Sequence, residues 1–343
     1  MKAVRIHEHG DPSVLRLDDV DVPRPGPNEV LCKVLAVSIN HLDLWVRRGM
    51  PGFKVEFPRI LGCDGTGEVV ECGSEVDAFT AGQKVVLEPG YSSGESPFDD
   101  EGLDHFAPDY AIRGEHGDGY DAEYVVLDQR YLCPLPDGLD PVQAAAVPLA
   151  FLTAWGMLDR AQLVPGETVL VVAGSSGVGS AAIQIAASMG AHVITTAGSD
   201  AKRQLCSDLG ANEVIDHYDP EWPREVKRLT DGEGADVVVE HVGPATWAGS
   251  MRSLARLGRL VTCGGTTGPK VSIALPHLFI KNQSVIGSTM GPASALPVIF
   301  DRVARGHYRP VLDSAVPMSE VRAAHERLEG GDVVGKLVLL PGE

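Results

Sequence analysis

Two patterns of hydrophobic and polar positions divide the chain near Pro141. Before it, short apolar runs such as VLRLDDV, EVLCKVLAVSI and GTGEVVECG alternate with Gly, Pro and Asp. Apolar positions that recur every second residue between turn-forming residues are typical of β-strands, so residues 1–130 predict a β-rich domain. Residues 89–119 have little periodicity and much Gly, Ser, Pro and Asp, which predicts a long excursion on the surface.

After Pro141 the pattern changes to strands that alternate with helices. The Ala-rich run PVQAAAVPLAFLTAWGML predicts a helix that is interrupted at Pro148. Strands that alternate with helices imply right-handed crossovers and a parallel, doubly wound sheet. Residues 314–340 predict a helix and then a strand that returns to the first domain. Further strands are predicted for ETVLVVA, HVITTA, EVIDH, ADVVVEHV, RLVTCGG and SVIGSTM, and helices for VGSAAIQIAASMG and DAKRQLCSDLG.

Length, composition and charge narrow the class of protein. A chain of 343 residues is long for one hydrophobic core, which predicts two domains. No apolar run is long enough to span a bilayer, and MKAVRIHEHG lacks the apolar core of a signal peptide, so a cytoplasmic protein is expected. A net charge of −18 repels phosphate backbones and anionic lipids, so neither nucleic acid nor membrane is an expected partner. Six scattered cysteines without a C-x-x-C pair argue against a disulfide framework and a zinc ribbon.

A glycine-rich turn after the first strand of the second domain predicts a dinucleotide site. Residues 171–179 read VVAGSSGVG and lie between a buried strand and a helix. Glycines let the backbone approach a pyrophosphate, whose charge is stabilised by the helix N-terminus. The candidate residues of this turn are Gly174, Ser176, Gly177, Val178 and Gly179. The alternative is a Gly-rich turn in an unrelated α/β protein.

The end of the next predicted strand bears on the choice of nicotinamide. An NAD site usually places a carboxylate there to bind the ribose 2′-hydroxyl. Ser199, Lys202 and Arg203 follow the strand here, and their hydroxyl and cationic groups suit a 2′-phosphate. Asp200 is the competing feature because it could serve NAD, although it also fits the first turn of a helix capped by Ser199. We therefore expect NADP(H) in preference to NAD(H).

With these segments placed, nearly the whole chain resembles the medium-chain dehydrogenase/reductase superfamily. Within it, the chain is similar to zinc-type alcohol dehydrogenases and, closest in character, to zinc-free quinone oxidoreductases and enoyl reductases. The resemblance implies an α/β fold with a GroES-like β-rich catalytic domain (residues 1–150 and 294–343) and a Rossmann dinucleotide-binding domain (residues 151–293). Besides the glycine-rich turn, the motifs that carry it are Pro25-Gly26-Pro27, Asn40-His41-Leu42-Asp43, Gly62-Cys63-Asp64-Gly65, Gly82-Gln83-Lys84-Val85, Leu152-Thr153-Ala154-Trp155 and Gly335-Lys336.

The departures from the zinc enzymes are informative. The positions that match their three catalytic zinc ligands read Asn40, Cys63 and Leu149 here. A catalytic zinc needs three protein ligands, and leucine cannot supply one, so no zinc is expected. The positions that match the four structural zinc cysteines read Ser93, Ser96, Asp99 and Ala107. By resemblance, the predicted excursion is therefore a lobe without its metal, held by packing and hydrogen bonds or mobile.

Four residues are candidates for substrate-side chemistry. Asn40 is the first choice for a polar substrate contact, with a turn-forming Asn as the alternative. His41 could donate a proton near neutral pH, or contact ribose, or be structural. Asp43 is expected to brace the pocket or to pair with Arg47 or Arg48. Cys63 is expected to be a small buried hydrophobic residue in preference to a reactive thiol.

The resemblance assigns further residues to the cofactor. It places Lys336 at the pyrophosphate, with a solvated cation on an edge strand as the alternative. The others are Thr153 near the phosphates or nicotinamide, Val242 and Gly243 under the ribose, Gly264 and Gly265 beside the nicotinamide, and Ser288 at its carboxamide.

Three functions fit these features. The first is an NADP(H)-dependent reductase of quinones, enones or other conjugated carbonyls that works without zinc. The second is an alcohol or aldehyde dehydrogenase with a residual or altered metal site, and the third is an NADP-binding protein without enzymatic activity. By analogy with relatives, the chain is expected to form a homodimer or homotetramer, with SVIGSTM as a pairing strand.

Overall fold

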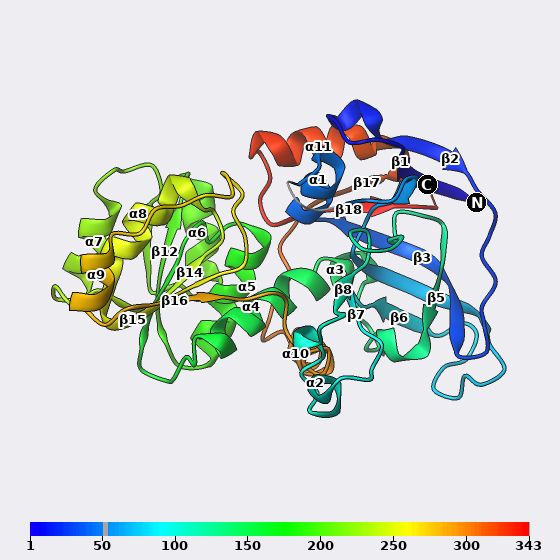
Figure 1. The fold of residues 1–343 in the computed structure, drawn as a ribbon, viewed down its shortest axis with the longest axis horizontal. Helices are drawn as coiled ribbons and strands as arrows, with labels where there is room; N and C mark the ends of the chain where they lie inside the picture. Colours follow the sequence, from blue (N-terminus) through cyan, green and yellow to red (C-terminus); the bar gives the residue numbers. More distant parts are fainter. Residues whose placement is uncertain (51–53, 343) are drawn as a thin grey trace. The chain divides into compact units, whose positions relative to one another are not determined.

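The computed structural model describes residues 1–50 and 54–342, and these divide into two compact units. Unit 1 comprises Met1–Leu149 and Pro292–Glu343, and unit 2 comprises Ala150–Gly291. The chain therefore leaves unit 1 once, completes unit 2, and returns (Figure 1).

Unit 2 is built on a six-stranded parallel sheet in the order β13-β12-β11-β14-β15-β16. Its central strands are buried and rich in Val, Ile and Leu, as expected for strands covered on both faces. Figure 1 shows helices on both sides of this sheet. Trp222 and Trp247 lie in the core between the sheet and helices α7 and α8. The elements of this unit are α4 (Pro148–Arg160), β11 (Thr168–Val171), α5 (Gly177–Ser188), β12 (His192–Ala197), α6 (Asp200–Asp208), β13 (Glu213–Asp216), α7 (Trp222–Leu229), β14 (Ala235–Glu240), α8 (Pro244–Ser253), β15 (Leu254–Thr262), α9 (Leu275–Ile280) and β16 (Ser284–Gly287).

Unit 1 is mostly β-structure. Its largest sheet has the order β10-β6-β5-β3-β18-β17, with β9 also paired to β3. The last strand of the chain, β18, therefore lies between β3 and β17 inside the sheet. The elements before unit 2 are β1 (Lys2–Ile6), η1 (Pro12–Val14), β2 (Arg16–Asp19), β3 (Glu29–Ile39), α1 (His41–Arg48), β4 (Arg59–Ile60), β5 (Asp64–Cys72), β6 (Lys84–Leu87), β7 (Gly90–Tyr91), α2 (Pro97–Asp100), η2 (Asp104–Phe106), β8 (Ala111–Ile112), β9 (Tyr124–Asp128), η3 (Gln129–Tyr131), β10 (Leu132–Pro134) and α3 (Pro141–Ala145). Those after it are α10 (Ala295–Ala304), β17 (Leu312–Pro317), η4 (Met318–Glu320), α11 (Val321–Gly330) and β18 (Lys336–Leu340).

The predicted Rossmann sheet and β-rich domain are confirmed, and two details of the sequence interpretation need correction. The 89–119 excursion is not without regular structure, because it contains the short elements β7, α2, η2 and β8. The tail was expected to be a helix and then a strand, but β17 precedes that helix and pairs in parallel with β18. Short elements such as these carry too few apolar positions for a period to be recognised.

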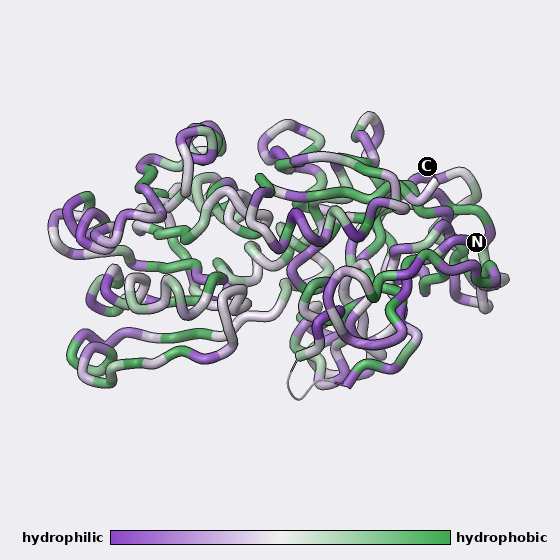
Figure 2. The backbone as a smooth tube through the Cα atoms, turned by 90° about the horizontal axis from the view of Figure 1, so that it is seen from above, coloured by the Kyte–Doolittle hydropathy of each residue, from purple (hydrophilic) through white to green (hydrophobic). Residues whose placement is uncertain are grey.

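Hydropathy along the chain follows this architecture. Figure 2 shows hydrophobic stretches running through the interior of each unit, with many outlying loops hydrophilic. Within the described ranges, no helix combines the length and the apolar character needed to cross a bilayer.

Candidate active site

The N-terminus of α1 holds two of the predicted site residues in a reciprocal cap. Asn40 is the N-cap residue, and its backbone N–H donates to Asp43 Oδ2 at 2.7 Å. The other oxygen of Asp43 accepts from the backbone N–H of Gly62 at 3.0 Å. Asp43 therefore braces helix α1 against the Gly62–Asp64 segment, and burial raises its pKa to about 6.

Of the two roles expected for Asp43, the structure shows the bracing role and not the pairing with Arg47 or Arg48. Both arginines contact Glu329 instead, and they lie at the C-terminal end of α1, a helix whose first turn contains Asp43. His41 is the first residue of the same helix and is partly exposed.

Asp64 connects the three positions that match zinc ligands in the relatives. The amide nitrogen of Asn40 donates to Asp64 Oδ1 at 2.9 Å and lies 3.2 Å from Cys63 Sγ. The backbone N–H of Leu149 donates to Asp64 Oδ2 at 3.0 Å. Ser38 Oγ adds a hydrogen bond of 2.5 Å to Oδ1. Asp64 is therefore the common acceptor of this buried network. In the sequence, only its position directly after Cys63 pointed to such a role.

Lys336 completes this network from β18. Its ammonium group donates to the backbone oxygen of Ile39 at 3.0 Å and to the side-chain oxygen of Asn40, and lies 4.0 Å from Asp64 Oδ2. Only 5% of Lys336 is exposed, so it is not the solvated edge-strand cation considered as an alternative. Within unit 1, the structure thus groups this lysine with Asn40, Asp43 and Cys63.

The donor set does not fit a catalytic zinc. Leu149 contributes only a backbone N–H, which cannot ligate a metal, and the side-chain oxygen of Asn40 is bound to Lys336. Cys63 is fully buried, and burial raises the pKa of its thiol well above the ordinary value. Among the described residues, no cluster of three or more His, Cys, Asp or Glu side chains is arranged to hold a metal ion.

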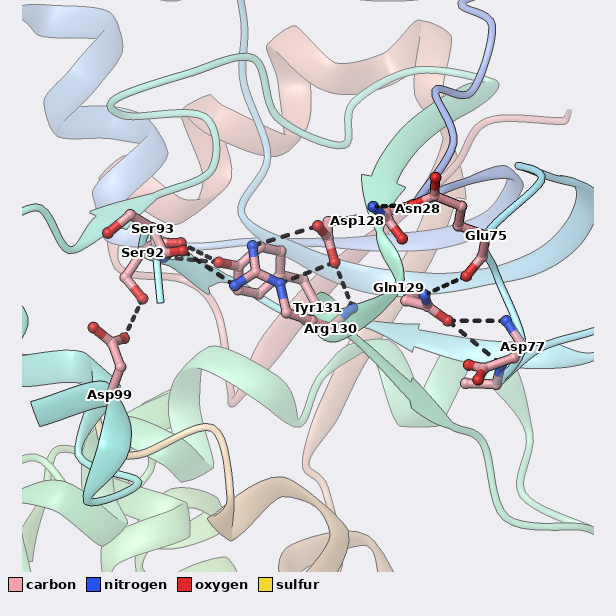
Figure 3. A network of polar contacts seen from close by, with 11 residues as sticks. Asn28, Glu75, Asp77, Ser92, Ser93, Asp99, Asp128, Gln129, Arg130 and Tyr131 are labelled. Carbon is pink, nitrogen blue, oxygen red and sulfur yellow. Dashed lines mark hydrogen bonds and ion pairs between the residues drawn. The ribbon is translucent and has the colours of Figure 1, made fainter. Parts of the chain in front are cut away.

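A carboxylate also organises the lobe that carries the four structural zinc positions. Asp99 accepts from Ser92 Oγ at 2.6 Å (Figure 3). It also accepts from Ser96 Oγ at 2.6 Å and from the backbone N–H of Ser96 at 2.9 Å. These hydrogen bonds hold the pKa of Asp99 below its ordinary value. Ser93 uses its backbone N–H to bind Asp109 at 2.8 Å, and Ala107 is buried.

The three residues of η3 tie the lobe to the rest of unit 1. The hydroxyl of Tyr131 contacts the backbone oxygen of Ser92 and accepts from the backbone N–H of Ser92 at 3.1 Å. Arg130 donates to the backbone oxygen of Ser93 at 3.2 Å. On the other side, Gln129 donates to the backbone oxygen of Glu75 at 3.2 Å (Figure 3). The lobe is thus attached to the rest of unit 1 by hydrogen bonds at Ser92 and Ser93.

In unit 2, the glycine-rich turn has the geometry of a dinucleotide site. Ser176 is the N-cap of α5, and its hydroxyl accepts from the N–H of Gly179 at 3.0 Å. Gly177 and Val178 begin the helix. A Cβ at Gly174 would collide with the Thr195 hydroxyl, and one at Gly179 with the backbone oxygen of Ala173. Only glycine therefore permits this close packing of turn, helix and strand.

The carboxyl end of β14 contains a carboxylate that the sequence interpretation did not identify. Glu240 is fully buried, and its Oε1 accepts from the backbone N–H groups of Val242 at 2.7 Å and Gly243 at 3.0 Å. Thr246 and Ser250 donate their hydroxyls to the same carboxylate. Glu240 therefore fixes the two backbone positions that the resemblance places under the ribose.

The remaining nicotinamide-side candidates lie near the ends of β15 and β16. Gly264 and Gly265 follow β15, and Ser288 follows β16 with its N–H donating to the backbone oxygen of Thr262 at 2.9 Å. The hydroxyl of Ser288 is buried and has no hydrogen-bond partner within the described chain. An orphaned buried hydroxyl fits a ligand group such as a carboxamide. Thr153 donates its hydroxyl to Met290 Sδ at 3.6 Å.

The end of β12 leads into the helix cap that the sequence predicted. Ser199 caps α6 by accepting from the N–H of Lys202 at 3.3 Å. Arg203 contacts the carboxylate of Asp200 and lies 3.7 Å from that of Asp216. Asp200 is thus both the first-turn acid of α6 and a partner of Arg203, one of the cations proposed for a 2′-phosphate.

Comparisons with known proteins agree with this geometry. A family model described as the alcohol dehydrogenase GroES-like domain matches residues 26–137, and one described as zinc-binding dehydrogenase matches residues 177–305. The chain is 32% identical to an NAD-dependent alcohol dehydrogenase of Sulfolobus acidocaldarius, over 99% of each chain. It is 33% identical to a quinone oxidoreductase of Pseudomonas aeruginosa, also over 99% of each. A crystal structure of an NAD-dependent alcohol dehydrogenase superposes with a TM-score of 0.96, at 43% identity and 99% coverage of both chains.

A dinucleotide-binding turn on a parallel sheet, joined in one chain to a GroES-like unit with a buried polar cluster, defines an NAD(P)-dependent oxidoreductase. The chain belongs to the medium-chain dehydrogenase/reductase superfamily.

Proposed function

We propose that this protein reduces quinones, enones or other conjugated carbonyls with a nicotinamide nucleotide and without catalytic zinc. The observation that carries the proposal is the Asp64 network, in which Asn40 and Leu149 donate to one carboxylate and the Asn40 amide also contacts Cys63, an arrangement that offers no set of zinc ligands. The similarity to a quinone oxidoreductase of Pseudomonas aeruginosa supports the same substrate class.

The chemistry of conjugated acceptors suits such a site. When bound, the nicotinamide supplies the hydride, and the protein's part is positioning and electrostatics. Hydride addition to a conjugated system places the negative charge on a remote oxygen, so a metal is less necessary than for the alkoxide of a simple alcohol. We assign Asn40 and Asp43 to shaping the substrate side, and the partly exposed His41, the first residue of α1, to proton donation.

The test is metal analysis of unchelated protein combined with an acceptor panel of quinones, enones, enoyl thioesters and aldehydes. We expect no stoichiometric zinc, and turnover of a conjugated acceptor that a chelator does not inhibit. Stoichiometric zinc with chelator-sensitive turnover of alcohols or aldehydes would instead support the alternative of a dehydrogenase with an altered metal site. Tight nucleotide binding without turnover on any acceptor would support a non-enzymatic role.

For the nucleotide, we propose a preference for NADP(H). The support is chemical: the end of β12 is Ala197 instead of a carboxylate, and Ser199, Lys202 and Arg203 follow it. Asp200 and Asp216 compete for the Arg203 guanidinium, so a 2′-phosphate must displace them.

Direct binding of NADPH and NADH tests this preference, with Asp216→Asn as the diagnostic variant. Removing the Asp216 charge leaves Arg203 with Asp200 as its one carboxylate partner instead of two, so we expect tighter NADPH binding and little change for NADH. If NADH binds the wild-type protein as tightly as NADPH, the preference is refuted.

We further propose a cytoplasmic homodimer or homotetramer that uses β16, the last strand in the order of the unit 2 sheet. Val285 on β16 and Leu275, Phe279 and Ile280 on α9 are exposed hydrophobic residues, a group that favours a protein partner. Sedimentation of wild type and Phe279→Glu tests the pairing. A monomeric wild-type protein would refute it.

A further inference from the structure

Lys336 lies in a buried environment with more acidic than basic groups. Asp43, Asp64 and Asp121 are all buried in the same part of unit 1, and each carboxyl group acts electrostatically on its neighbours. Burial and the two neighbouring carboxyl groups raise the pKa of Asp121 well above its ordinary value. Asp64 keeps hydrogen bonds from Asn40, Ser38 and Leu149, all of which suit a carboxylate.

A carboxylate without exposure to water is costly unless a cation balances it. The Lys336 ammonium, 4.0 Å from Asp64 Oδ2, is in the position to do so. Both side chains are buried, 6% and 0% exposed, so water screens their interaction little.

Lys336 also determines which way the Asn40 amide faces. An ammonium group only donates hydrogen bonds, so the atom of Asn40 that meets Lys336 must be the oxygen. The amide nitrogen then faces Cys63 Sγ and Asp64 Oδ1, where it donates. With the amide reversed, two donors would meet at Lys336 and two acceptors would meet at Asp64.

We propose that Lys336 is the fixed cation of this site: it balances the buried charge of Asp64 and holds the Asn40 amide in one orientation. It acts through Asn40 and is therefore a positioning residue, in a role separate from the pyrophosphate contact that the resemblance assigns to it. The role exists in the protein without nucleotide, and it does not depend on the proposed substrate class.

A double-mutant cycle on the nucleotide-free protein tests the proposal. Lys336→Met keeps the length of the side chain and removes its charge, and Asp64→Asn removes the partner's charge with little change in shape. We expect each single variant to lower the midpoint of denaturant unfolding, and the double variant to lie above Lys336→Met. Lys33→Met, at an exposed lysine on β3, is the matched control and should leave the midpoint unchanged.

If Lys336→Met does not fold, folding of the double variant would equally support the proposal. A double variant that is no more stable than Lys336→Met would overturn the proposal, because the lysine would then act by packing alone.

Discussion

The guanidinium group of Arg47, on α1, is completely buried against the carboxylate of Glu329 on α11. The same guanidinium donates to the backbone oxygen of Gly10 at 3.2 Å and lies 3.2 Å from His325 Nδ1. Arg48 contacts Glu329 as well, at 2.8 Å, but its side chain is half exposed. Glu329 thus contacts two consecutive arginines, one buried and one half exposed. Helix α1 begins at the site, and these contacts anchor its C-terminal end.

These two arginines provide a matched test of burial. We expect Arg47→Met to lower the free energy of unfolding by about 3–5 kcal/mol, because it leaves the Glu329 charge and the Gly10 oxygen without their buried partner. Arg48→Met should cost less than about 1 kcal/mol, because water screens and replaces its contact. Chemical denaturation of both variants measures the difference. Equal costs would show that burial of the Arg47 pair contributes nothing.

His325 should make unit 1 sensitive to acid. Burial, with Arg47 and Arg48 nearby, lowers the pKa of His325 to about 3 from an ordinary value of 6.5. Below pH ~6.5 the His325 imidazole binds a proton in the unfolded chain but not in the folded one. The free energy of unfolding therefore falls by about 1.4 kcal/mol for each pH unit, until His325 also titrates in the folded protein near pH 3.

Unfolding free energies of wild type and His325→Asn across this range check the expectation. The Asn side chain can still accept from Arg47 but cannot take up a proton, so its stability should change less with pH. The same slope in both proteins would contradict it.

Ser288→Ala should separate stability from cofactor binding. The Ser288 hydroxyl is buried without a partner, and leaving such a group unpaired costs about 1–3 kcal/mol. We expect the alanine variant without nucleotide to be at least as stable as wild type, and to bind NADPH several-fold more weakly, since a hydrogen bond contributes about 0.5–1.5 kcal/mol. Thermal unfolding and titration with NADPH measure the two effects. An unchanged affinity would remove Ser288 from the cofactor site.

Asp99 should hold the lobe in the absence of a metal. Asp99→Asn retains the shape but loses the charged acceptor for Ser92 and Ser96, so limited proteolysis within residues 89–119 should become faster than in wild type. Asp100→Asn, at the next residue of α2, is the control.

The pKa of Asp99 is lowered in the folded lobe, so its contribution is present above the ordinary carboxylate pKa and is lost as pH falls through the lowered value. Wild-type cleavage should therefore approach that of the variant only in strong acid. Equal rates for the two proteins at neutral pH would exclude Asp99 as the centre of the lobe.

The sequence predicted those parts of the molecule that depend on local pattern. The strand at His192–Ala197 and the helix after Ser199 follow from periodicity and a capping residue, and both lie where expected. The roles of Asp64 and Glu240 could not be predicted this way. Each carboxylate is defined by donors from distant segments, such as Leu149 N–H for Asp64 and the Ser250 hydroxyl for Glu240.

The burial of Lys336 also could not be predicted from the local sequence. A lysine at the start of a strand is typical of an exposed edge, and only the position of β18 between β3 and β17 buries it. Pairing of strands remote in sequence depends on the whole sheet, which periodicity along one segment does not report.

Because β18 is an inner strand of unit 1, synthesis on the ribosome completes this unit last. Residues 150–291 are contiguous and emerge before β17 and β18, so the nucleotide-binding unit can fold while the sheet of the other unit still lacks an inner strand. Asn40 and Lys336 are separated by 296 residues of chain. The nascent protein thus contains its glycine-rich cofactor turn long before Lys336 is synthesised. A chain that terminates before β18 keeps the turn but lacks Lys336.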